Sequence, residues 1–259
     1  MVDTRENLEV VTLNRPHALN AFNPAMVDEI LDYFTELHER PEIRVVLLRG
    51  AGRAFCAGLD LKEGMADEKG GRVRSQWRNQ RRIVRIIELM RSCPQPIVGL
   101  GHGAACGGGF SLLLACDIRY AAPNLRMNAA YIKVGLSGCD IGASYLLPRL
   151  VGLSLAAELL LTGRFIDAER AKAINLVSDI VPEEQLLNAG LTMAEEMLAN
   201  SPMGLALTKD ALNLNIDAPS LAAAIALEDR QQIMLCGTDD HNEAVAAFRE
   251  HRPPRYRGR

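Results

Sequence analysis

Two glycine-rich segments could bring backbone N–H groups close to a negatively charged atom. They are GAGRAFCAGLDL (50–61) and GHGAACGGGF (101–110), and each directly follows a short apolar run that is typical of a buried strand. Exposed N–H groups at such turns, and at the start of a following helix, favour negative charge. Glycines there also allow tight turns and close packing. Because two such segments follow two strands, we favour a binding role in which two donors converge on one oxygen.

Three familiar motifs do not account for these glycines. GLGHGA (99–104) fits the glycine pattern of dinucleotide-binding proteins, but the helix after it is too short, and Asp117 opens the next strand instead of ending it. Neither segment has the G-K-[ST] of a phosphate-binding loop. GLSGC (135–139) has cysteine where a nucleophile elbow needs its last glycine. A dinucleotide-dependent reductase is therefore a distant alternative, and nothing supports a covalent serine mechanism.

Alternating strands and helices must position the two segments. A helix is predicted to start at Asn23, a good N-cap, with Pro24 at its first position. The other elements of the first half are expected as strands over 8–13, 44–50, 96–100 and 117–122, and as helices over 71–93 and 110–116. This alternation predicts a layered α/β fold.

The second half is predicted to be mostly helical. After about residue 140 only 176–181 has the pattern of a strand. From Ser201 onward everything is expected to be helical, with Ser201 and Pro202 at the start of the first helix. We therefore expect an α/β core over residues 1–200 and a C-terminal helical region over residues 201–259.

Composition limits the class of protein. The 259 residues carry a net charge of −3, which gives no reason to expect nucleic acid or a membrane surface as partner. No signal peptide or membrane-length apolar run is recognisable. The six cysteines lie in apolar segments and form no C-x-x-C pair, so we interpret them as buried, reduced thiols of a cytoplasmic protein. The histidines show no metal-binding spacing, and no metal site is expected.

Four blocks of sequence, in this order, resemble the enoyl-CoA hydratase/isomerase, or crotonase, superfamily. They are LNRPHALNAF (13–22), GRAFCAGLDLKE (52–63), PQPIVGLGHGAACGGGFSLLLACDIRYAA (94–122) and LLLTGRFIDAERAKAINLVSDIV (159–181). The resemblance implies a spiral α/β core of repeated ββα units with a C-terminal helical trimerisation region. It also implies a homotrimer or a dimer of trimers, and an acyl-CoA thioester as substrate with no separate cofactor.

The resemblance also implies roles for individual residues. Two backbone N–H groups would form an oxyanion hole for the thioester, and motif position assigns them to Ala57 and Gly108. The coenzyme A part would lie against two backbone segments and a C-terminal pair of side chains. These residues are His17, Ala18 and Leu19, then Ala57, Gly58, Leu59, Asp60 and Leu61, and finally Phe248 and His251.

The chain departs from the family's hydratases at both of their catalytic glutamates. Ser111 stands at the first position and Tyr131 at the second. Neither serine nor tyrosine is an effective general base near neutral pH without a strongly perturbed pKa. Positioned acid–base groups typically supply about 10²–10⁴ in rate. We therefore expect weak or no hydration of short enoyl-CoAs.

Asp140 is the candidate replacement base. Dienoyl-CoA isomerases and dihydroxynaphthoyl-CoA synthases of the superfamily have an aspartate at a similar place, although the segment here is one residue longer. Asp140 could instead cap the helix that is expected to begin near Gly142. Both roles are weighed equally. In the catalytic hypothesis, Tyr131 or Ser111 positions substrate or water.

Six arginines crowd the helix predicted over 71–93. They are Arg72, Arg74, Arg78, Arg81, Arg82 and Arg85. We interpret them as a solvated or subunit-facing surface rather than as contacts to CoA phosphates, because amphipathicity alone explains them. Trp77 is expected to pack on the opposite face.

The sequence thus predicts an enzyme of the enoyl-CoA hydratase/isomerase class that stabilises a thioester enolate. Isomerisation or other enolate chemistry with Asp140 as acid–base group is favoured over ordinary hydration. The alternative is a catalytically silent protein that binds acyl-CoA.

Overall fold

A six-stranded sheet organises the first part of the chain. The structure is a computed structural model that describes residues 1–64 and 71–259. The strand order is β1-β2-β3-β4-β6-β9, and all neighbours are parallel except β1 and β2. The strands are β1 (Val2–Arg5), β2 (Leu8–Leu13), β3 (Val45–Gly50), β4 (Ile97–Gly101), β6 (Ile118–Ala121) and β9 (Asp179–Ile180). Strands β3 and β4 are almost entirely buried, as expected where helices cover both faces of a parallel sheet.

A second, smaller sheet receives the chain each time it leaves the first. It consists of β5 (Ala104–Cys106), β7 (Arg126–Asn128) and β8 (Ile166–Asp167). The chain passes from β4 to β5 and from β6 to β7, and an isolated bridge pairs Cys56 with Ala105 in the same way after β3. This repeated step between two sheets is the spiral of ββα units that the resemblance implies.

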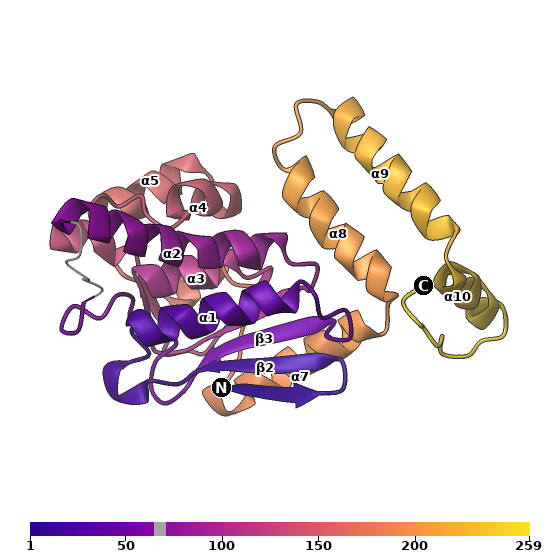
Figure 1. The fold of residues 1–259 in the computed structure, drawn as a ribbon, viewed down its shortest axis with the longest axis horizontal. Coiled ribbons are helices and arrows are strands. Elements are labelled where there is room, and N and C mark those ends of the chain that lie inside the picture. The colour runs from indigo at the N-terminus through magenta and orange to yellow at the C-terminus, as the bar shows by residue number, and fades with distance from the viewer. Residues whose placement is uncertain (65–70) are drawn as a thin grey trace.

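Helices cover both faces of the large sheet (Figure 1). The helices of this part of the chain are α1 (Pro24–Leu37), α2 (Arg72–Ser92), α3 (Gly108–Ala115), α4 (Ala143–Val151), α5 (Leu153–Thr162), α6 (Ala168–Ala173) and α7 (Leu186–Leu198), with short 3₁₀ turns at η1 (Pro16–Ala18), η2 (Ala130–Val134) and η3 (Glu183–Gln185). Of these, α4 and α5 lie beyond α2 and α3, away from the sheet. The larger core cluster contains Phe34, Met90 and Phe110 from α1, α2 and α3. A second cluster packs α7 against Leu47 and Leu100 on the other face.

Three C-terminal helices extend away from the sheets. They are α8 (Pro202–Asn215), α9 (Leu221–Cys236) and α10 (Asp239–Arg249), and Figure 1 shows them as an arm beside the core. The Ser201 hydroxyl caps α8 by accepting from the Gly204 N–H at 3.1 Å, as predicted. The chain after Arg249 has no further helix, so the prediction of helix to the very end is wrong. The division into domains at residue 200 stays a prediction.

Local patterns predict most core elements well. Asn23 caps α1, with its side-chain oxygen 3.0 Å from the Met26 nitrogen. α3 begins at Gly108, two residues earlier than expected, because the glycines themselves form its first turn. The strand expected over 176–181 is reduced to β9. Strands as short as β5, β7 and β8 were not predicted, because two or three residues carry no readable alternation.

The arginine-rich helix differs from expectation on its apolar side. Trp77 is 66% exposed and does not pack against the core. Arg82 pairs with Asp28, and Arg81 and Arg85 both pair with Glu88, so these three arginines lie on a solvated, ion-paired surface. The core-facing side of α2 is formed instead by buried residues that include Ile83, Ile86, Ile87 and Met90.

All six cysteines are free thiols. Cys139 and Cys236 are exposed, so the expectation of buried thiols fails for those two in the single chain. Within the described ranges, no helix is both long and apolar enough to cross a membrane.

Candidate active site

The two glycine-rich segments meet at one cavity of about 140 Å³. Residues 57–59 line one side and residues 107–108 line another, at the start of α3. The remaining walls come from Phe22, α2, η2 and the loop that leads into α4. The sequence prediction that both segments serve one place therefore agrees with the geometry.

The glycines are needed because backbone lies against backbone here. A Cβ atom at Gly109 would lie only 2.0 Å from the Cys56 carbonyl oxygen, and one at Gly108 only 2.7 Å from the Phe22 ring. Gly58 has a φ of +92°, and a Cβ there would lie 3.3 Å from the Gly108 nitrogen. Any side chain at these positions would push the two segments apart. Their close approach places the N–H groups beside Gly58 and at Gly108 on one side of the cavity.

Ala57 does not fit the role of oxyanion donor that was predicted for it. Its N–H already donates to the Leu19 carbonyl oxygen at 3.0 Å. Leu59, two residues later, has an N–H with no acceptor among the described residues, and the same is true of Gly108. The pair of available donors is therefore Leu59 and Gly108.

A short parallel bridge explains how Leu59 is oriented. Phe22 donates to the Gly58 carbonyl at 2.7 Å and accepts from the Asp60 N–H at 2.9 Å. In an extended segment, successive backbone groups point to opposite sides. Because the groups flanking Leu59 face Phe22, the Leu59 N–H faces away from it, toward the cavity that Leu59 lines.

Ser111 and Tyr131 lie together, but in a closed hydrogen-bonded chain. The Tyr131 hydroxyl donates to the Gly107 carbonyl oxygen at 2.6 Å and lies 2.6 Å from the Ser111 hydroxyl. Ser111 is fully buried and Tyr131 nearly so. Burial raises the pKa of the Tyr131 phenol well above its usual value. Both groups are therefore neutral, and neither is poised to act as a base.

Asp140 contributes a carboxylate to the cavity wall. Its Oδ1 accepts hydrogen bonds from the Ile141 N–H, at 2.8 Å, and from the Gln80 side-chain amide of α2. Burial raises the pKa of Asp140 above that of an ordinary aspartate, and these two hydrogen bonds partly oppose the rise. Oδ2 has no hydrogen-bond donor among the residues that the structure describes.

The capping role considered for Asp140 is not observed. The N-cap of α4 is Gly142, with a φ of 79°, and no side chain caps this helix. Only the backbone carbonyl of Asp140 takes part, by accepting from the Ala143 N–H at 2.8 Å. The carboxylate is thus free of a helix-end function.

Gln80 was missed by the sequence analysis. No local motif marks it, because its significance depends on α2 packing against a loop sixty residues away. The only hint was that a polar residue on the arginine-rich helix stands next to the apolar Ile83 side of that helix.

The two segments expected to hold coenzyme A, residues 17–19 and 57–61, are fixed by local hydrogen bonds and ion pairs. His17 is exposed on η1, next to Ala18 and Leu19. The Asp60 carboxylate accepts from the N–H groups of Lys62 and Glu63, which lower its pKa. Asp60 is therefore committed to its own turn, and any ligand contact there would come from backbone or from the exposed Leu59 and Leu61.

Arg15 joins the two halves of this segment and was also missed. Its guanidinium lies 3.1 Å from Asp60 and 2.6 Å from Glu63. The neighbouring Asn20 side chain is buried and donates to the carbonyls of Ala51 and Ala54. These contacts hold residues 15–20 against residues 51–63.

Phe248 and His251 do not approach the cavity in this chain. Phe248 is 82% exposed on α10, and no residue of α8, α9 or α10 lines the cavity. Figure 1 shows α10 beside the start of α8, on the side of the arm away from α2 and α3. Their predicted contact with coenzyme A is therefore not made within one subunit.

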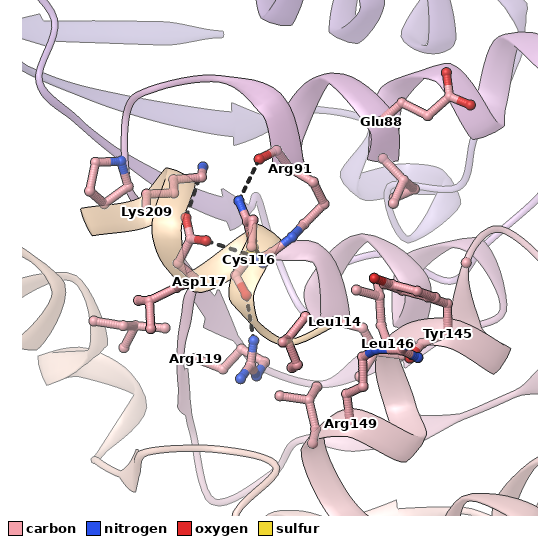
Figure 2. A pocket seen from close by; sticks show the side chains of 18 of the residues that line it. Glu88, Arg91, Leu114, Cys116, Asp117, Arg119, Tyr145, Leu146, Arg149 and Lys209 are labelled. Atoms are coloured by element: carbon pink, nitrogen blue, oxygen red, sulfur yellow. Dashed lines mark hydrogen bonds and ion pairs between the residues drawn. The ribbon is translucent and has the colours of Figure 1, made fainter. Parts of the chain in front are cut away.

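The carboxylate of Asp117 is fixed by ion pairs and a backbone hydrogen bond. It lies 2.9 Å from both Arg91 and Lys209, and it also accepts from the Ile97 N–H (Figure 2). α3, which precedes it, has only eight residues. These contacts leave Asp117 no role in binding a dinucleotide ribose.

Comparison with known proteins identifies the family of the chain. A family model described as "Enoyl-CoA hydratase/isomerase" matches residues 3–259. The chain belongs to the enoyl-CoA hydratase/isomerase family. The "Probable enoyl-CoA hydratase echA12" of Mycobacterium bovis is 38% identical over 254 residues, which is 96% of this chain and 89% of that protein.

Solved structures extend the match to three dimensions. An enoyl-CoA hydratase from Bacillus anthracis superposes with a TM-score of 0.94 at 33% identity, covering 100% of this chain and 99% of the other. A monofunctional enoyl CoA isomerase from Mycobacterium smegmatis gives a TM-score of 0.74 at 37% identity, covering 87% and 97%. The crotonase fold and the enoyl-CoA hydratase/isomerase class predicted from the sequence are thereby confirmed.

Proposed function

We propose that the protein moves the double bond of an enoyl-CoA thioester, with Asp140 as its single acid–base group. The observation that carries this proposal is the composition of the cavity. Among its described lining residues, Asp140 has the only carboxylate, and the two positions expected for hydratase glutamates hold a neutral, mutually bonded serine and tyrosine. A relative of known structure that is 37% identical is described as an enoyl CoA isomerase, which is consistent with this assignment.

The proposed reaction needs one proton to leave and return. The Asp140 carboxylate removes a proton from the α-carbon of a 3-enoyl thioester, and the electron pair spreads over the diene and the thioester oxygen. The N–H groups of Leu59 and Gly108 stabilise the negative charge on that oxygen. Asp140, now protonated, gives the proton to the γ-carbon. The product is the conjugated 2-enoyl thioester, and no water is consumed.

A single carboxylate suits this transfer better than it suits hydration. Water addition needs a group that activates the water and a group that protonates carbon. The Ser111 and Tyr131 hydroxyls are buried and already committed to each other and to Gly107. Losing positioned acid–base groups typically costs about 10²–10⁴ in rate each. Slow hydration with retained isomerisation is the expected pattern.

Two assays on the purified protein test the proposal. With 3-hexenoyl-CoA, the conjugated thioester absorbance should appear, and Asp140→Asn should slow its appearance by about 10²–10⁴. With crotonyl-CoA, the same absorbance should disappear slowly or not at all. Rapid hydration of crotonyl-CoA, or unchanged isomerisation by Asp140→Asn, would overturn the assignment.

The alternative is a protein that binds acyl-CoA without turning it over. The neutral Ser111–Tyr131 pair favours it, because the usual catalytic carboxylates are gone while the glycines of the oxyanion hole remain. Such a protein would bind saturated and unsaturated acyl-CoAs tightly by calorimetry and turn over no 3-enoyl, dienoyl or hydroxyacyl thioester.

Assembly and location stay predictions. A homotrimer or dimer of trimers would cover the apolar arm and could bring Phe248 and His251 of one copy to the coenzyme A of another. The cytoplasmic location rests on the free thiols and has no further support.

A further inference from the structure

A second, larger cavity lies on the same face of α2 as the candidate active site. The first cavity includes Ile83 in its wall, and the second includes Ile87, one helical turn further. On the facing side, the first includes Ile141 and the second includes Gly142. The two cavities therefore follow one another along α2, and the consecutive loop residues Ile141 and Gly142 line one cavity each.

We propose that the Ile141 side chain limits the length of the acyl chain that can bind, because it closes the active-site cavity against the larger cavity. This inference rests on the proposed function in one respect, namely that the first cavity holds the acyl group beside its thioester. It predicts short acyl chains as substrates of the natural protein and longer ones once Ile141 is shortened.

The sizes of the cavities support this. The first measures about 140 Å³, roughly the volume of five water molecules at about 30 Å³ each. A cavity of this size suits a short acyl group. The second measures about 650 Å³. It would hold the rest of a long chain without rearrangement of the core.

The lining of the second cavity suits a hydrocarbon. Apolar side chains such as Val84, Leu114, Leu146 and Leu212 contribute to its walls. Figure 2 shows Leu114 and Leu146 in the wall, with the ion-paired Arg91, Asp117 and Lys209 gathered to one side. The other cationic lining residues also have protein partners, since Arg119 donates to the carbonyls of Leu176 and Cys116 and Arg149 pairs with Asp217. The apolar walls are left to contact a ligand.

The conformation of the wall residue is unusual. Ile141 has a φ of 46°, in the left-handed region that β-branched residues rarely adopt, and Gly142 follows with a φ of 79°. Ile141 is 7% exposed, and its Cδ1 atom lies 3.5 Å from the Cβ position at Gly108. The Asp140 carboxylate holds the Ile141 N–H at 2.8 Å. Such strain persists where surrounding contacts fix it, as these do between the oxyanion hole and the base.

The experiment measures binding of saturated acyl-CoAs from four to fourteen carbons by titration calorimetry. The natural protein should gain affinity by up to about fourfold per methylene, as apolar burial predicts, only to about six carbons and then level off. Ile141→Ala should continue to gain affinity to ten carbons or more, with at least a tenfold advantage over the natural protein at ten carbons. Ile141→Val should fall between them, which keeps the test available if the alanine variant is unstable.

Two further variants identify where the chain goes. Ile87→Trp, added to Ile141→Ala, should remove the long-chain gain by obstructing the end of the second cavity that is nearest to Ile141. Ile30→Ala is the matched control, because Ile30 is also 7% exposed but lies on α1 away from both cavities. It should lower stability and leave the chain-length profile unchanged.

The outcomes separate this inference from the proposed function. An affinity of the natural protein that keeps rising from six to twelve carbons, an unchanged profile in Ile141→Ala, or a gain that survives Ile87→Trp would overturn the role proposed for Ile141. Saturated thioesters do not react, so the profile is measurable even if no isomerisation occurs. Absence of all acyl-CoA binding would overturn both proposals. Isomerisation together with an affinity that does not depend on acyl-chain length would overturn only the role proposed for Ile141.

Discussion

The Asp140 carboxylate has one oxygen held by protein donors and one that is not. Oδ1 accepts from Ile141 and Gln80, and burial raises the pKa of the group. A base that returns its proton needs both a fixed position and a pKa closer to that of its substrate, and this environment serves both needs. Gln80 is thus a positioning residue for the proposed reaction.

The pH profile should report this hydrogen bond. Because Asp140 must be ionised to remove a proton, kcat/KM should fall as pH decreases through its raised pKa. Gln80→Leu removes a hydrogen bond that favours the ionised form, so the acid limb should move upward by about one pH unit. Gln76→Leu, one turn away on the exposed part of α2, is the control and should leave the limb in place. Identical limbs in all three proteins would contradict the role of Gln80.

Asp140 should also reduce stability at neutral pH. Its pKa is higher in the folded than in the unfolded chain, so the folded state binds more protons between the two values, and stability falls as pH rises through that interval. Asp140→Asn removes this loss. We expect the variant to be more stable at pH 7, by less than about 1 kcal/mol because the carboxylate is partly solvated. The difference should vanish near pH 3 in denaturant titrations, and a variant that is less stable at pH 7 would refute the expectation.

Sequence reasoning reached some of these residues and not others. Ser111, Tyr131 and Asp140 were found because motif position places them, and the cavity does include Tyr131 and Asp140. Ala57 was chosen in place of Leu59 because the hydrogen bond to Leu19, which decides between them, joins segments far apart in the chain.

Among the elements, α8 is held to the core by the buried Lys209 and by Asn213, whose side chain exchanges hydrogen bonds with Arg91. The Lys209 ammonium is 5% exposed and donates to the carbonyls of Met90 and Gln95, and it lies 2.9 Å from Asp117 (Figure 2). The remainder of the helix exposes large apolar side chains such as Leu212 and Leu214. Lys209 is thus the buried charge among several polar contacts that position the arm in one chain.

Removing that lysine should be costly. Lys209→Met leaves Asp117 and two carbonyls short of a buried donor, and breaking such a buried pair typically costs about 3–5 kcal/mol. Chemical denaturation should give that loss, and limited proteolysis should cut between α7 and α8 sooner. Lys172→Met is the control, since its ion pair with Asp179 is exposed and worth less than about 1 kcal/mol. Equal losses in the two variants would show that Lys209 is no special anchor.

The elements themselves were largely predictable. Buried strands such as β3 and β4 and long amphipathic helices such as α1 and α2 carry strong periodic signals. The short strands of the second sheet do not, since their pairing is decided by where the chain leaves the first sheet. The Ile141–Gly142 turn could not be predicted from the sequence either, because no local pattern favours an isoleucine with a positive φ.

At the scale of the whole molecule, the arm presents more apolar surface than a monomer usually exposes. Leu221, Ile233 and Phe248 on α9 and α10 are each at least 74% exposed. The expectation of self-association came from the family resemblance. Composition alone could not supply it, because the apolar fraction averaged over 259 residues does not reveal where apolar side chains gather on the surface.

Self-association should follow from that surface. Sedimentation at micromolar concentration should give a species of three or six chains, and Ile233→Glu should shift it toward smaller species by at least tenfold in concentration. Val2→Glu, which adds the same charge on the exposed strand β1, should leave the assembly intact. A natural protein that sediments as one chain would refute the prediction.

The bridge between Cys56 and Ala105 has a chemical consequence for the proposed reaction. It places two thiols beside the oxyanion hole, and burial raises the pKa of Cys56 to about 12 and that of Cys106 to about 11. Only a thiolate attacks an electrophile readily. The conjugated thioester that the proposed isomerisation would form is a Michael acceptor. Neither thiol lines the cavity that would hold it, and burial keeps both protonated. The close packing of the two glycine-rich segments thus also protects the protein from alkylation by the product of the proposed reaction.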